Sequence, residues 1–226
     1  MSARVQTRQD SRIQSEVMRE LRWDTRVENQ EIGVVVANGI VTLTGLADSY
    51  AKKLAAQEAA HKVAGVLDVA NEIQVRIPGT MARGDPEIAK AVRSALEWDV
   101  WVPDERITST VSNGWVTLEG EVGILRERAD AERAIRRLFG VRGVTNKIEV
   151  SPRTVAAEDL REAIEQALER RAEREARRIK VEVRGDQVTL SGRVRCWAEK
   201  RAILGIVNHS PGVRAVHENL FVDPMF

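Results

Sequence analysis

One phrase occurs three times in this chain, and a repeat limits the possible folds more than any other sequence feature. The copies are NGIVTLTG at 38–45, NGWVTLEG at 113–120 and GDQVTLSG at 185–192. Their shared threonines, Thr42, Thr117 and Thr189, lie 75 and 72 residues apart. Aliphatic residues and glycines on both sides repeat at the same two intervals. The pattern therefore predicts three equivalent structural units, because a single active site would need the phrase only once.

The boundaries of the units follow from the residues that still align at their ends. Each unit closes on a valine, at Val75, Val150 and Val222, and the next unit begins after a linker of variable length. The shorter second interval comes from the linker, since spacings inside the units agree. The sequence thus predicts three domains at 10–77, 85–152 and 157–224.

Each unit reads as helix, two strands, helix and strand. Aliphatic residues four positions apart, such as Ile88, Val92 and Leu96, predict a first helix with a narrow apolar face. Alternation in segments such as 179–183 predicts strands, and Asn-Gly is the strongest short signal for a hairpin. The expected class is α+β, with three tandem αββαβ domains, each a three-stranded sheet carrying two helices on one face.

Caps and glycines mark where these elements begin and end. Asp10 and Asp85 are predicted to be N-caps of the first helices, with Pro86 at the first helical position, and Thr154 is the possible start of the third. Gly65, Gly140 and Gly212 are expected at the C′ position that stops the second helix. The structural glycines of the repeat are Gly39, Gly45, Gly65, Gly114, Gly120, Gly140, Gly192 and Gly212.

Composition narrows the class of protein. Apolar residues form 43% of the chain, charged residues 31%, and the net charge of +1 gives no general attraction to nucleic acid or anionic membranes. Cys196 is the only cysteine, which excludes an intrachain disulfide and a cysteine metal cluster. Charged residues interrupt the first 21 positions, and no run of about 18 apolar residues follows. We therefore expect no signal peptide, no transmembrane segment and a cytoplasmic protein that contacts membranes at most peripherally.

The pattern I-x-V-x-V-x-N-G-x-V-x-L-x-G followed by G-V-x-x-V-x-N-x-I-x-V resembles the BON family, a module of osmotically inducible periplasmic proteins, secretins and some channels. The first two units match it closely, whereas the third has Gly185-Asp186 in place of Asn-Gly and Glu218 in place of Asn71 and Asn146. The resemblance implies an αββαβ fold and a binding function without enzymatic activity. It also implies association with phospholipid membranes in osmotic shock or envelope maintenance.

Chemistry-bearing residues show no catalytic pattern. His61, His209 and His217 have no nucleophile or carboxylate at a supporting spacing, so we interpret them as solvated surface residues and predict neither catalytic residues, nor a metal site, nor a cofactor. The segment 140–143 is a G-x-x-G, as in KH domains. It joins a helix to a strand here and is interpreted as a helix stop, so no nucleic-acid partner is expected.

The tryptophans indicate a binding surface more clearly than the histidines do, because the tryptophan ring favours both membrane–water interfaces and buried protein contacts. Trp98 and Trp101 follow the first helix of the second unit and are candidates for packing in an interface between domains or for lipid or partner contact. Trp115 lies about 17 Å away, at the other end of a strand. With Ile40 it falls on the helix-free sheet face, a candidate surface between domains or toward a partner.

Basic residues at Arg170, Arg171 and Arg174 are further candidates for lipid headgroups, although interleaved glutamates also suit a solvated helix end. The leading interpretation is a phospholipid-binding module, and a protein–protein scaffold or self-assembling module remains an alternative. A sensor of small ligands or monovalent ions is a further alternative.

Overall fold

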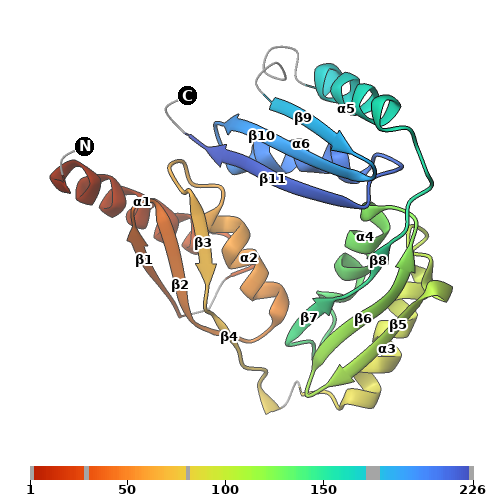
Figure 1. Ribbon diagram of the computed structural model, residues 1–226. Coiled ribbons are helices and arrows are strands. Elements are labelled where there is room, and N and C mark those ends of the chain that lie inside the picture. Colours follow the sequence, from red (N-terminus) through yellow and green to blue (C-terminus); the bar gives the residue numbers. More distant parts are fainter. Residues whose placement is uncertain (1–2, 28–30, 80–81, 172–178, 224–226) are drawn as a thin grey trace.

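The computed structural model describes residues 3–27, 31–79, 82–171 and 179–223, and it contains three αββαβ domains (Figure 1). The first domain comprises α1 (Ala3–Trp23), β1 (Ile32–Ala37), β2 (Ile40–Ala47), α2 (Tyr50–Ala60), β3 (Asp68–Asn71) and β4 (Gln74–Val75). The second comprises α3 (Asp85–Trp98), a 3-10 turn η2 (Asp104–Arg106), β5 (Ile107–Ser112), β6 (Trp115–Val122), α4 (Leu125–Ile135), β7 (Gly143–Asn146) and β8 (Glu149–Val150). The third comprises α5 (Ala157–Arg171), β9 (Ile179–Arg184), β10 (Gln187–Val194), α6 (Trp197–Asn208) and β11 (Ala215–Val222).

The repeated phrase forms the central strand of each sheet, as predicted. In the first domain β2 pairs antiparallel with β1 and parallel with β3, and the other two domains repeat this order. A parallel partner cannot follow through a tight turn, so the second helix of each domain crosses over one face of the sheet. Both helices therefore cover the same face and leave the other free of helices.

Each domain has its own apolar core beneath its two helices. In the second domain the predicted stripe of Ile88, Val92 and Leu96 is at most 1% exposed and packs with Val116 and Leu118 of β6. Burying an aliphatic side chain of this size contributes roughly 1.5–3 kcal/mol. The alternating burial of the central strand, with Thr117 between two buried residues, confirms the expected strand period.

The last strand is broken in the first two domains, where the sequence predicted one continuous strand. The Asn71 carboxamide oxygen accepts a hydrogen bond from the Ile73 amide (3.3 Å), and its nitrogen donates to the Lys53 carbonyl of α2 (2.9 Å). Asn146 makes the same two bonds in the second domain. Glu218 takes this position in the third domain, and β11 runs unbroken beside β10 over its whole length. The asparagine is therefore the physical cause of the break.

The two predicted aspartate N-caps are wrong, because both residues lie inside helices. Asp10 is within α1, and Asp85 is the first residue of α3, whose N-cap is Gly84. The Asp85 carboxylate accepts hydrogen bonds from the amides of Asn113 (2.8 Å) and Gly114 (2.9 Å) in the hairpin turn, and Asp10 binds the first hairpin in the same way. These aspartates tie the first helix to the turn.

The third domain lacks this aspartate, and its turn is held differently. Helix α5 begins at Ala157, so Thr154 does not start it. Gly185 has a φ of 62°, and the Asp186 carbonyl accepts a hydrogen bond from the Arg214 amide (2.8 Å), as the carbonyls of Gly39 and Gly114 accept in the other two turns. The Arg214 guanidinium also pairs with the Asp186 carboxylate at 3.0 Å. A local ion pair replaces the helix-to-turn bond.

The predicted C′ glycines also lie elsewhere. Helices α2, α4 and α6 end at Ala60, Ile135 and Asn208, four or five residues before Gly65, Gly140 and Gly212. These glycines close the turn into the last strand with φ near 90°. A Cβ on Gly140 would lie 2.8 Å from the Ile88 side chain, so the turn needs glycine to pack against the first helix.

We predict that Asp85→Ala loosens the second hairpin, because two charge-assisted hydrogen bonds are lost and two amides lose their acceptors. Amide hydrogen exchange at Asn113 and Gly114 should accelerate, and urea titration should show a loss of about 1.5–3 kcal/mol. The exposed Glu121→Ala on β6 is the control and should change neither quantity. Unchanged exchange at both amides would refute this role of Asp85.

We predict that Gly120→Ala strongly destabilises the second domain. Gly120 has a φ of 136°, and a Cβ there would collide with the backbone carbonyl of Arg106, which cannot move without breaking the β5–β6 pairing. The expected cost is roughly 3–5 kcal/mol, measured as a fall in melting temperature. Gly79→Ala, with open space around the new Cβ, should be close to neutral.

Candidate functional site

The second helices α2, α4 and α6 gather in the middle of the molecule, and the first helices α1, α3 and α5 lie at its periphery (Figure 1). The contacts between domains are made by residues of these second helices. The Tyr50 ring at the start of α2 packs against the core of the second domain, and Leu125 at the start of α4 packs against the core of the third. Trp197 at the start of α6 stacks on His61 of the first domain, with ring centroids 4.0 Å apart.

This stack corrects the interpretation of His61 as a solvated residue. Burial lowers its pKa from the ordinary value of 6.5, and the neighbouring Arg201 and Lys200 lower it further against the opposing charges of Asp68 and Glu58. His209 and His217 are exposed, as predicted. Trp197 was not singled out in the sequence, although its position at the start of a second helix repeats those of Tyr50 and Leu125.

The two tryptophans predicted to contact lipid or a partner are both exposed. Trp98 ends α3 and is 86% exposed, and Trp101 in the following loop is 62% exposed. The Arg126 guanidinium lies 4.6 Å from the centroid of the Trp101 ring, a cation–π contact that holds a positive charge beside it. The structure thus places an aromatic and basic pair at the end of the first helix.

Trp23 is a further exposed tryptophan that sequence reasoning missed. It ends α1 and is 85% exposed. Trp23 and Trp98 are 75 residues apart, the interval that relates the first two domains, so they occupy the same position in the repeat. The repeat interval was the signal that could have identified Trp23. Two large apolar rings exposed at one repeated position are candidates for burial against a lipid surface or a partner.

An arginine-lined cavity lies where the first and second domains meet. It has a volume of about 310 Å³ and is lined by Arg26, Ala51, Leu54, Ala55, Glu58, Arg136 and Arg137. The Glu58 carboxylate accepts a hydrogen bond from Arg26 (2.7 Å) and lies 3.7 Å from Arg136. Three guanidinium groups therefore share the cavity with one carboxylate, which leaves it net positive above an aliphatic floor.

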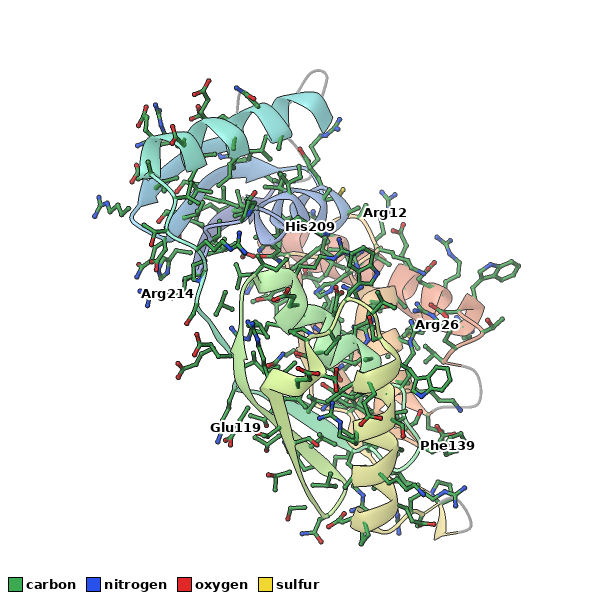
Figure 2. All side chains as sticks on the ribbon, turned by 90° about the vertical axis from the view of Figure 1, so that its right-hand side faces the viewer. Arg12, Arg26, Glu119, Phe139, His209 and Arg214 are labelled. Atoms are coloured by element: carbon green, nitrogen blue, oxygen red, sulfur yellow. The ribbon has the colours of Figure 1, made fainter. Side chains whose placement is uncertain are left out.

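Arg26 is held firmly in this cavity. It also binds both Asp24 oxygens, at 3.0 and 2.8 Å, and these bonds hold the pKa of the Asp24 carboxyl well below its usual range. In Figure 2, Arg26 lies on the same side of the molecule as Phe139, a 68% exposed ring that follows Arg136 and Arg137, while Glu119 and Arg214 lie on the opposite side. We call the exposed rings of Trp23, Trp98, Trp101 and Phe139 and the three cavity arginines, which are grouped by their chemistry, the aromatic–arginine surface.

Trp115 and Ile40, the other predicted contact residues with described side chains, lie on the sheets. Trp115 and Ile40 are about half exposed on the helix-free sheet faces, as their strand parity predicted. The Trp115 ring lies over Gly143 of its own sheet, and its indole N–H donates to the Thr145 hydroxyl at 2.7 Å. Arg170 and Arg171 end α5, and Arg174 lies outside the described residues. The sheet faces as partner surfaces remain a prediction.

Among the residues that the structure describes, no group of three or more His, Cys, Asp or Glu side chains could hold a metal ion. None of the helices described here has both the length and the apolar character needed to cross a bilayer.

Comparisons with known proteins agree with the repeat. The model of the BON domain matches residues 9–77, 84–152 and 156–224. Osmotically-inducible protein Y of Escherichia coli K12 is 27% identical over 144 residues, which cover 62% of this chain and 72% of that protein. CdsD, a structural protein of the type III secretion system of Chlamydia trachomatis, aligns over 92% of this chain and 91% of its own with 12% identity and a TM-score of 0.27. That TM-score is too low for a comparison of domain arrangement.

The three family matches coincide with the three αββαβ domains and leave only the linkers and chain ends unmatched. This chain therefore belongs to the BON domain family, of which it carries three tandem copies.

Proposed function

We propose that this protein is a non-enzymatic module that binds anionic phospholipid surfaces in the response to osmotic stress. The osmotic setting is supported by the similarity to osmotically-inducible protein Y. The choice of an anionic phospholipid as the ligand is supported by the chemistry of the aromatic–arginine surface. The observation that carries the proposal is the exposure of Trp23 and Trp98, at 85% and 86%, at one repeated position.

The chemistry of the surface suits the interface of a bilayer. A tryptophan ring places its apolar body among the upper acyl chains while its N–H stays hydrated. Each ring removes on the order of 150–250 Å² of surface from water when it is buried. At about 25 cal/mol per Å², even partial insertion of two rings contributes a few kcal/mol.

Arginine would supply the preference for anionic lipid. Arg136 and Arg137 line a cavity together with the aliphatic residues Ala51, Leu54 and Ala55. Guanidinium groups bind phosphate oxygens through paired N–H donors. Each basic residue near an anionic surface contributes roughly 1 kcal/mol, and that contribution falls with salt.

We predict that Trp23→Ala with Trp98→Ala lowers flotation with phosphatidylglycerol-rich vesicles by about tenfold or more, because apolar burial of both rings is lost. Trp115→Ala is the matched control, since it removes a half-exposed tryptophan from the helix-free sheet face. Equal loss in the control would move the site to that face. Full binding by the double variant would contradict the proposal.

We predict that Arg136→Gln with Arg137→Gln lowers binding to the same vesicles about 30-fold at low salt, which corresponds to about 2 kcal/mol for two charges. The loss should shrink at high salt and with phosphatidylcholine vesicles. Arg184→Gln with Arg214→Gln removes the same charge from the third domain and, at Arg214, from the opposite side (Figure 2). Equal losses in both double variants would show that net charge acts without a site.

A further inference from the structure

The same position of the repeat makes the contact from each domain to another. Tyr50, Leu125 and Trp197 are the first residues of α2, α4 and α6, at the repeat intervals of 75 and 72 residues. Tyr50 reaches the second domain, Leu125 the third and Trp197 the first. The order is therefore cyclic, from one to two, two to three and three back to one.

The residues that these first residues contact in the neighbouring domain also stand at equivalent positions of the repeat. His61, which receives Trp197, caps the C-terminus of α2, and Arg136 holds the equivalent cap position of α4. Burial raises the pKa of the Tyr50 hydroxyl, and the nearby Glu132 carboxylate raises it further, whereas Arg136 lowers it. The hydroxyl also forms a hydrogen bond with the backbone of Val144 in the second domain. The start of one second helix thus meets the end of another, and a head-to-tail contact of this kind forms a ring when it closes.

The structure assigns to Trp197 and His61 a further role: they form the latch that closes a head-to-tail ring of the three domains, and protonation of His61 opens it. Short linkers hold neighbouring domains together at the other two contacts. The latch joins the first and last domains, which no linker connects directly, so it is the contact that decides whether the ring is closed.

The latch has two buried ring nitrogens without partners and already has one cation beside it. The two rings stack at an interplanar angle of 24°, and both the His61 Nε2 and the Trp197 Nε1 are buried without a hydrogen-bond partner. The Lys200 ammonium already lies 4.5 Å from the centroid of the Trp197 ring, and it pairs with Glu218 at 2.6 Å. A second cation on His61 would lose hydration and would meet this charge at short range.

Burial is the largest cause of the lowered pKa of His61, and the charged groups around it act in both directions. Arg201 and Lys200 of α6 face it from the third domain, and Asp68 of β3 and Glu58 of α2 face it from the first. Burial, the largest cause, and the two cations lower the pKa of His61. The closed ring therefore binds a proton less readily than the open form. Closure is fully present above the ordinary value of 6.5 and weakens as the pH falls from there toward the lowered pKa.

The test measures the distance between the first and third domains in the full-length protein. Cys196 is the only cysteine, is exposed and adjoins Trp197, so it takes one spin label, and the exposed Glu72→Cys of the first domain takes the other. Pulsed electron resonance at pH 7.5 should give one narrow distance distribution. At pH 5.0 a second, longer distance should appear, and its share of the distribution should be at least about three times the share found at that distance at pH 7.5.

Two variants in this background separate the latch from its proton. Trp197→Ala should populate the longer distance at both pH values, because the stack is removed. His61→Phe keeps a neutral ring and should stay closed at pH 5.0, while the exposed His217→Phe should keep the wild-type response. If Trp197→Ala unfolds its domain by circular dichroism, His61→Ala opens the latch from the other side.

A distance that stays narrow and unchanged in Trp197→Ala, or in the His61→Ala substitute, would overturn the latch. Opening at pH 5.0 that persists in His61→Phe would overturn the role of the proton. No lipid enters these measurements, so their outcome does not depend on whether the protein binds membranes.

Discussion

The parallel pairing between the central and last strands is the constraint on which the rest of the structure depends. A parallel return needs a crossover, and the crossover helix must run the length of the sheet on the face already covered by the first helix. Its two ends therefore lie at opposite ends of the domain. In this protein those ends are the contacts between domains, so the topology of one domain prepares the head-to-tail assembly of three.

The third domain shows how far the details can change while this constraint holds. It lacks the aspartate that ties the first helix to the hairpin, and Glu218 replaces the asparagine that breaks the last strand. The Asp186–Arg214 pair and the Lys200–Glu218 pair take over. Lys200 then holds its charge over Trp197, so the substitution that makes β11 continuous also contributes to the latch.

Tyr50, Leu125 and Trp197 make contacts in a cyclic order from equivalent positions of the repeat. Other equivalent positions of the repeat carry exposed side chains. Trp23 and Trp98 are such a pair, at the ends of the first helices α1 and α3. Opening the latch leaves the Tyr50 contact between the first and second domains in place, so it frees the third domain and does not separate Trp23 from Trp98.

Local pattern determined much of this protein. The repeat, the alternation in the strands, the Asn-Gly turns and the stripes of the first helices depend on residues close in sequence, and their three domains are confirmed by the family matches. Trp98 and Trp101 could be singled out from the sequence because they follow the apolar stripe, but their exposure came from the structure and their contact with lipid or a partner stays a prediction. Only the tertiary structure decided which distant side chains meet. The Asp85 bonds to the hairpin, the Glu58 cavity and the stack of Trp197 on His61 each join residues from separate elements. Their energies depend on distance and burial, which no spacing within one segment of sequence encodes.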